Sequence, residues 1–263
     1  MPHDLLLGKN TPAGGGPEMT DLSDLGKRIA SLNAQHRESD ALGVLRGVLN
    51  DPENGRIALV SSFGAEAVVL LHMVASINKS TPVIFIDTQM LFYETLMYQA
   101  DLTEQLGLWN VRIIRADEHE IAARDPQGTL HQSNPDACCA LRKTRPLNLA
   151  LEGHDGWITG RKRFQAGSRA ALEFFEADEA SGRIKINPLA HWTPQDVRAY
   201  MEGNDLPKHP LISKGYPSIG CAPCTSKVAD GEDPRAGRWR GQEKTECGIH
   251  FADGAIVRKG IAA

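Results

Sequence analysis

The sequence lacks a long apolar run and an excess of basic residues. No stretch approaches the ~18 apolar residues that a membrane-spanning helix requires. The leucines at residues 5–7 are too few for a signal-peptide core, and no basic stretch precedes them. The formal net charge is −4, whereas proteins that bind nucleic acid usually carry a basic excess. These absences predict a cytoplasmic protein with no membrane or nucleic-acid partner.

Cysteines are few, and their number is odd, which argues against complete pairing in disulfides. Cys138 and Cys139 are adjacent, and Cys221 and Cys224 form a C-x-x-C pair. Four thiolates gathered in two places can hold an iron–sulfur cluster or a zinc ion. The side chains of an adjacent pair diverge, which suits two corners of a cluster better than one ion. A buried small hydrophobic residue is the alternative reading of the doublet.

The fifth cysteine, Cys247, has Lys244, Glu246 and His250 as sequence neighbours. A partly exposed thiol near cations has its thiolate form favoured, which a nucleophile requires. An incidental surface cysteine is the alternative. The position of Cys247 after the other four cysteines and an arginine cluster favours the nucleophile.

Apolar runs alternate with helical patterns from residue 56 onward, which predicts an α/β fold with a mostly parallel sheet flanked by helices. We expect a flexible tail at 1–19, one domain at 20–251 with a nucleophile-bearing segment at about 235–251, and a second tail at 252–263. Two short helices are predicted within 22–49, and the segment after residue 207 is rich in Gly and Pro and is expected to be irregular. The predicted strands are 57–60, 83–86, 111–114, 157–160 and 183–186, and the later helices are 65–77, 92–106, 140–151 and one starting at Thr193.

Polar or glycine-rich residues follow three of the predicted strands, where ligands bind in parallel sheets. The first set, Ser61, Ser62, Phe63 and Gly64, precedes a helix whose N-terminus could hold an anion, although a plain helix cap is equally compatible. Asp87 and Thr88 end the second strand and Gly160 the fourth. A turn-forming Asp is the alternative for Asp87.

Basic residues cluster at 142–145, at 161–163 with Arg169, and at 235–240. One such run is usually a solvated face. Three runs beside cysteines or strand ends in an acidic chain instead indicate a pocket for a small dianion. One arginine can donate two parallel hydrogen bonds to the oxygens of a phosphate or sulfate group.

These segments together resemble the assimilatory adenylyl-sulfate (APS) and phosphoadenylyl-sulfate (PAPS) reductases over residues 57–251. The resemblance rests on the set C-C…C-x-x-C…E-C-G-I-H, which is highly specific, with the strand-end and arginine segments. It implies an adenine-nucleotide α-hydrolase-like (PP-loop) fold. By motif match it implies that Cys138, Cys139, Cys221 and Cys224 hold a 4Fe-4S cluster and that Cys247 is the nucleophile. The substrate-binding residues it implies are Ser61, Ser62, Phe63, Gly64, Asp87, Thr88, Lys143, Gly160, Arg163, Arg169, Arg235, Arg238 and His250.

The implied reaction is the thioredoxin-dependent reduction of APS to sulfite and AMP through an S-sulfocysteine, in assimilatory sulfate reduction and cysteine biosynthesis. The full cysteine set favours APS over PAPS, with a PAPS or dual reductase as the alternative. Thioredoxin is expected to be a separate protein, and a homo-oligomer is possible. The sequence departs from the family pattern at Gln89, Met90, Ala166 and Arg240, which puts the details of substrate contact in question.

Two functions of other classes compete with this prediction. One is a PP-loop enzyme that uses ATP, such as a sulfurtransferase or ligase. The segment 61–66 counts against it, because it lacks the second Gly and the Asp of S-G-G-x-D-S. The other is a zinc- or cluster-bearing nucleotide sensor, in which Cys247 would have no role.

Overall fold

The computed structural model describes residues 22–178, 181–242 and 244. These residues form a six-stranded sheet in the order β3-β2-β1-β4-β6-β5, in which β5 alone among the described strands runs antiparallel to its neighbour. The mostly parallel α/β fold is therefore confirmed. The strands are β1 (Ile57–Val60), β2 (Val83–Ile86), β3 (Val111–Ile114), β4 (Gly156–Ile158), β5 (Phe175–Asp178) and β6 (Arg183–Ile186).

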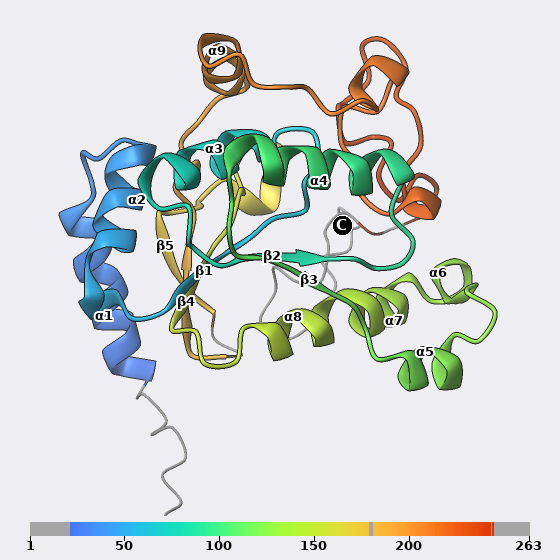
Figure 1. The fold of residues 1–263 in the computed structure, drawn as a ribbon, viewed down its shortest axis with the longest axis horizontal. Helices are drawn as coiled ribbons and strands as arrows, with labels where there is room; N and C mark the ends of the chain where they lie inside the picture. Colours follow the sequence, from blue (N-terminus) through green and yellow to red (C-terminus); the bar gives the residue numbers. More distant parts are fainter. Residues whose placement is uncertain (1–21, 179–180, 243, 245–263) are drawn as a thin grey trace, which may run out of the picture.

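Helices cover both faces of this sheet, with α3 and α4 on one side and α7 and α8 on the other (Figure 1). The α-helices are α1 (Leu22–Gln35), α2 (Ala41–Asn50), α3 (Ala67–Ile77), α4 (Tyr93–Leu106), α5 (Glu118–Arg124), α6 (Leu130–Ser133), α7 (Pro135–Cys139), α8 (Arg145–Ala150) and α9 (Pro194–Gly203). Short helical turns are η1 (Pro52–Asn54), η2 (Ala140–Thr144), η3 (Arg163–Gln165), η4 (Gly167–Arg169), η5 (Ile212–Lys214) and η6 (Ala222–Cys224). No helix among the described residues is long and apolar enough to cross a membrane.

The two faces of β1 explain the two halves of the core. Leu59 packs with the residues of α2, α3 and α4, whereas Ala58 packs with Leu147 and Leu151 on the opposite face. Successive residues of a strand point to opposite faces, so a short run that is apolar throughout is buried on both sides. The apolar strands β1 and β2 are therefore interior strands of the sheet, whereas β3, which the sequence also predicts, lies at its edge.

The structure corrects two predicted elements and adds a strand that was not predicted. The edge strand β5 was not predicted, because its sequence Phe-Glu-Ala-Asp has no apolar run. The helix predicted at 140–151 is instead a continuous stretch from Pro135 in which a π-helical turn, η2, joins α7 to α8. The fourth strand ends at Ile158, two residues earlier than predicted. After residue 207 the described chain has only short turns, as expected.

Candidate active site

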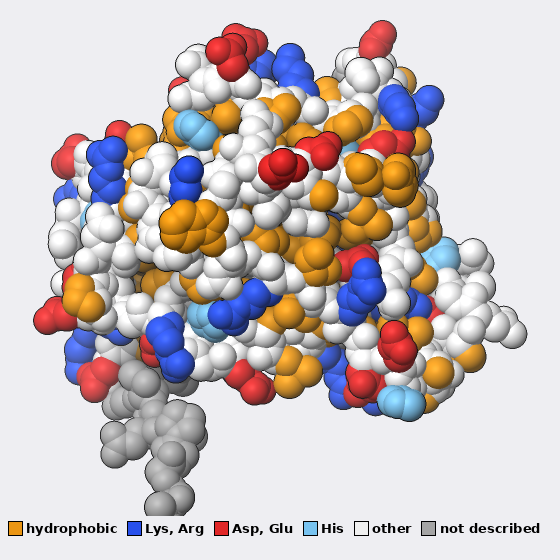
Figure 2. Space-filling model, viewed as in Figure 1, with side chains coloured by type: hydrophobic (Ala, Val, Ile, Leu, Met, Phe, Trp, Pro, Cys, Tyr) orange, Lys and Arg blue, Asp and Glu red, His pale blue; other side chains and the backbone are white. Residues whose placement is uncertain are grey.

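A cavity of about 300 Å³ opens at the carboxyl end of the parallel strands. Its wall includes the loop after β1, the segment after β4, and two stretches of the irregular C-terminal part of the domain. Figure 2 shows acidic and basic side chains interspersed on the face turned to the viewer. Many of the predicted substrate-binding residues line the cavity itself. They are Ser61, Ser62, Gly64, Lys143, Gly160, Arg169, Arg235 and Arg238.

The loop after β1 is anchored by Phe63, whose side chain is fully buried. Its ring contacts Phe85 edge to face, with the ring centroids 5.2 Å apart. Phe63 has a left-handed backbone (φ 47°), and its N–H donates to Ser61 Oγ at 3.2 Å. The side chain of Phe63 therefore packs in the core rather than against a ligand, and it holds Ser62 and Gly64 at the cavity wall before α3.

The three consecutive cations after β4 point to different partners. Arg161 and Lys162 line the cavity, and Arg163 is not among the lining residues. The guanidinium of Arg163 donates to Leu172 O at 2.8 Å and pairs with Glu173 at 3.1 Å. The family resemblance implies Arg163 as the substrate-binding residue of this triplet, whereas the structure brings Arg161 and Lys162 to the cavity.

Lys162 forms a buried ion pair with Glu66, with Nζ 2.9 Å from Glu66 Oε2. The same oxygen accepts a hydrogen bond from Gln165 Nε2 at 3.3 Å. Burial lowers the pKa of Lys162, and the carboxylate of Glu66 opposes that shift. The two partners are 96 residues apart in the sequence, and no local pattern joins them. Glu66, Lys162 and Gln165 were therefore not predicted as site residues.

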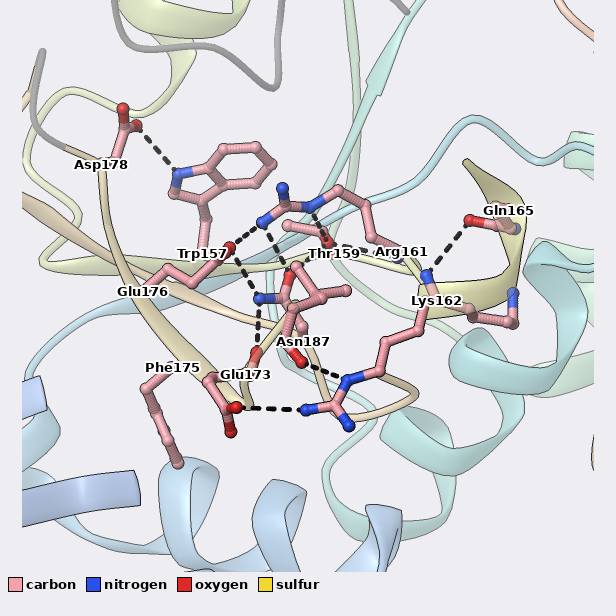
Figure 3. Close-up of polar contacts among 12 residues, drawn as sticks. Trp157, Thr159, Arg161, Lys162, Gln165, Glu173, Phe175, Glu176, Asp178 and Asn187 are labelled. Carbon is pink, nitrogen blue, oxygen red and sulfur yellow. Dashed lines mark hydrogen bonds and ion pairs between the residues drawn. The ribbon is translucent and has the colours of Figure 1, made fainter. Parts of the chain in front are cut away.

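A second layer of polar contacts fixes Arg161 (Figure 3). Arg161 Nη2 donates to Asn187 Oδ1 at 3.0 Å and also pairs with Glu176 of β5. Asn187 Oδ1 in turn accepts a hydrogen bond from Thr159 Oγ1 at 2.9 Å, and Asn187 Nδ2 donates to Glu176 at 3.0 Å. The unpredicted edge strand thus supplies the carboxylate that holds a cavity cation in place.

The first two residues after β2, Asp87 and Thr88, make their contacts outside the cavity. Asp87 forms an ion pair with Arg115 at 2.9 Å. The Thr88 hydroxyl lies 3.2 Å from Cys221 Sγ. Neither Asp87 nor Thr88 is among the lining residues. Gln89, at the position where the family pattern has glycine, adopts a left-handed backbone with φ 59°.

The four cysteines predicted as ligands gather in one buried place. Cys139, Cys221 and Cys224 pack around Trp239. Burial raises the pKa of Cys138 to about 11, and the charges that act on this thiol include those of Cys221 and Cys224. Burial also raises the pKa of Cys224, against the opposing effect of nearby cations, Lys143, Arg238 and Lys244.

Four thiols in one buried place are the donor type that an iron–sulfur cluster requires. No group of three His, Cys, Asp or Glu side chains within the described part of the chain is placed to hold one metal ion. A cluster offers several metal corners to separate thiolates, so its ligands need not converge on one point. The surrounding cations would stabilise four thiolates that burial otherwise disfavours.

Cys247 and His250 lie outside the described residues. Lys244, three residues before Cys247, is described and buried. Its ammonium group pairs with Asp136 at 2.6 Å and lies 5.7 Å from the centroid of the Trp239 ring. Lys244 is therefore anchored beside the cysteine pocket.

Known proteins with similar sequences are sulfonucleotide reductases. A model of the phosphoadenosine phosphosulfate reductase domain matches residues 56–227. A curated adenosine 5′-phosphosulfate reductase of Mesorhizobium japonicum is 49% identical over 225 residues, which are 86% of this chain and 88% of that protein. One from Chelativorans sp. is 53% identical over 199 residues, 76% of this chain and 80% of that protein.

The fold comparison agrees with the sequence comparison. A crystal structure of phosphoadenylyl-sulfate reductase from Candida auris superposes with a TM-score of 0.66 at 30% identity and covers 77% of this chain and 97% of that one. Yeast FAD synthetase, at 16% identity and a TM-score of 0.51, covers 78% of this chain and 76% of its own and shows likeness of fold alone. Because the model of the phosphoadenosine phosphosulfate reductase domain matches more than half of this chain, the chain belongs to that family.

Proposed function

We propose that this protein reduces APS to sulfite and AMP in sulfate assimilation, with thioredoxin as the electron donor. The observation that carries the proposal is the position of the cavity. The cavity lies at the strand ends, next to the pocket of four buried cysteines. Lys143 and Arg238 line the cavity, and their charges also act to lower the pKa of the Cys224 thiol. The curated relatives described above, both named APS reductases, favour APS over PAPS.

The cavity cations neutralise the phosphosulfate. Lys143, Arg169, Arg235 and Arg238 line the cavity, and guanidinium groups bind such oxygens in a bidentate manner. A Cβ at Gly220 would collide with the guanidinium of Arg238, so glycine at this position lets Arg238 reach the wall. Fixed cations that stabilise the charge developing on AMP as it leaves lower the barrier without reorganising during the reaction.

Cys247 is the nucleophile in this proposal. Its thiolate attacks the sulfur of APS, an S–S bond forms, and the S–O bond to AMP breaks, with the electron pair leaving on AMP. A thioredoxin thiolate then attacks Cys247 Sγ, and sulfite leaves with the electron pair of the S–S bond. The second thiol of thioredoxin releases Cys247 and closes the thioredoxin disulfide, so the dithiol supplies both electrons. The anchoring of Lys244 beside the cysteine pocket supports a nucleophile at this end of the cavity.

Cys138, Cys139, Cys221 and Cys224 would hold the 4Fe-4S cluster. When bound, the cluster supplies a fixed charge distribution beside the phosphosulfate rather than a path for electrons. Burial and the cations around these thiols are what the chain itself contributes to that environment.

Anaerobic purification followed by parallel sulfite assays tests the proposal. With thioredoxin and its reductase, APS should give sulfite and PAPS much less, and the protein should contain about four irons per chain. Sulfite from neither nucleotide would refute a reductase function. Formation of AMP and pyrophosphate from ATP would instead support the ATP-using class.

A further inference from the structure

The cavity holds an acidic side chain that an anionic ligand does not explain. Among the described residues that line it, the basic side chains are Lys143, Arg161, Lys162, Arg169, Arg235 and Arg238, and the acidic ones are Glu66 and Asp233. A carboxylate in a site for a phosphosulfate costs binding energy unless it meets a hydrogen-bond donor of the ligand. Glu66 therefore calls for an explanation of its own.

Glu66 is oriented by its partners and still open to the cavity. Its Oε2 accepts from both Lys162 and Gln165, whereas its Oε1 makes no hydrogen bond with any residue that the structure describes. The Glu66 side chain is 33% exposed, against 3% for Lys162. Glu66 stands at the N-cap of α3, yet its side chain makes no capping hydrogen bond. One carboxylate oxygen is thus held and the other is available to a ligand.

The neighbours of Glu66 indicate which part of a nucleotide it meets. Gln165 donates to Glu66 and accepts from Arg169, a cavity-lining cation that the proposed function assigns to the phosphosulfate. The carboxylate is therefore two hydrogen bonds from a phosphate-binding group. Adenine requires apolar walls for its faces, and the cavity lining includes Leu59, Val60 and Ile86 of the strands. The group next to the 5′-phosphate is the ribose, whose hydroxyls are uncharged donors.

We propose that Glu66 accepts a hydrogen bond from the ribose 3′-hydroxyl and repels a phosphate at that position, so that it sets the preference for APS over PAPS. This inference rests on the proposed function. The two nucleotides differ only by that 3′-phosphate, and a carboxylate distinguishes the hydroxyl from the phosphate by both hydrogen bonding and charge. Glu66 also neutralises Lys162, which would otherwise attract the extra phosphate.

The substitution Glu66→Gln tests this directly, because it keeps the size and an acceptor oxygen for Lys162 and removes the charge. Binding of AMP and of adenosine 3′,5′-bisphosphate is measured by calorimetry, and kcat/KM is measured for APS and PAPS. We expect the ratio of the two affinities, and of the two kcat/KM values, to move toward the 3′-phosphorylated ligand by about 10-fold or more, since a like charge next to a phosphate costs over 1.4 kcal/mol. The matched control is Glu173→Gln, which removes a carboxylate from the Arg163 pair away from the cavity and should leave both ratios unchanged.

Two further results decide whether the charge of Glu66 sets the preference for APS over PAPS. Glu66→Asp keeps the charge and should keep the discrimination, whereas a role limited to packing would make Asp and Gln equally harmful. If Glu66→Gln binds AMP and retains the wild-type ratios, Glu66 only neutralises Lys162 and the inference is wrong. If the wild-type protein reduces neither nucleotide, the proposed function fails, but the binding ratios still test the role of Glu66.

Discussion

The Thr88 hydroxyl lies 3.2 Å from Cys221 Sγ, although the two residues are 133 positions apart in the sequence. This contact joins the end of β2 to the C-x-x-C turn. The Leu91–Cys221 bridge and the hydrogen bond from Ala222 N to Met90 O at 2.7 Å support the same junction. Thr88, Met90 and Leu91 therefore tie the loop after β2 to the C-x-x-C turn, whereas the position of this loop in the sequence suggests a contact with the nucleotide.

Substituting Thr88→Val should weaken retention of iron without preventing its binding. Valine has the same shape and lacks the hydroxyl, so Cys221 loses a hydrogen-bond partner that is worth about 1 kcal/mol. We expect near-normal iron content after anaerobic purification and bleaching of the visible absorption in air that is a few-fold faster. The control is Thr81→Val, because the buried hydroxyl of Thr81 makes no hydrogen bond with any residue that the structure describes. Equal bleaching rates in the two variants would contradict this role of Thr88.

Arg169 and Arg163 should differ in their effect on substrate binding. Arg169 lines the cavity, whereas Arg163 is paired with Glu173 and Leu172 O. A hydrogen bond to a charged group is worth about 1.5–3 kcal/mol, so Arg169→Ala should raise KM for APS by roughly 10- to 100-fold. Arg163→Ala should change it by less than about 3-fold. Steady-state kinetics of both variants measures the difference, and the reverse order would restore Arg163 as the substrate ligand that the resemblance implies.

Gln89→Gly should stabilise the protein by about 1 kcal/mol. Gln89 has a left-handed backbone, which costs a residue with a Cβ roughly 1–2 kcal/mol, partly offset by the greater chain entropy of glycine when unfolded. Urea unfolding of the two proteins measures the change. The control is Gln195→Gly in the first turn of α9, where the backbone is right-handed and glycine should destabilise by up to about 1 kcal/mol. Destabilisation by both substitutions would show that the backbone at Gln89 is not strained.

His209 should make the stability of the protein fall between neutral and acidic pH. Burial lowers its pKa from 6.5 to about 4, and its ring contacts Thr95 and Tyr98. Between these two pH values the unfolded chain binds a proton that the folded protein does not, so the free energy of unfolding decreases as the pH falls.

His209→Gln removes the contribution of His209 to this pH dependence. That contribution is a difference of up to about one bound proton between the unfolded and the folded protein. Urea unfolding between pH 6.5 and pH 4 should show a shallower decline for the variant. The slopes are compared rather than the absolute values, because the substitution also removes hydrogen bonds. Parallel slopes for the two proteins would mean that His209 is not held neutral by the fold.

The sequence predicts five of the six described strands and misses the edge strand β5, for a physical reason. The buried strands β1 and β2 must be apolar, so their composition reveals them. The edge strand β5 is defined by its pairing with β6 and by the partners of Glu176, and neither is a property of its own four residues.

The same reason explains which residues of the candidate site could be predicted and which could not. The grouping of Cys138, Cys139, Cys221 and Cys224 could be predicted because their spacing is itself the signal, and the structure brings these four residues together. The Glu66–Lys162 pair and the choice between Arg161 and Arg163 depend on which side chains the fold places opposite each other. Phe63 shows the converse, since it belongs to a site motif and yet its side chain packs in the core.

The most direct test of the central claim is the mass of the protein after one equivalent of APS is added without thioredoxin. The account predicts release of AMP and a mass increase of one SO₃ group on the peptide that contains Cys247, with sulfite appearing only when thioredoxin is added. Cys247→Ser should show neither the adduct nor sulfite while it retains its iron. Sulfite production by Cys247→Ser, or an adduct on another cysteine, would contradict the account.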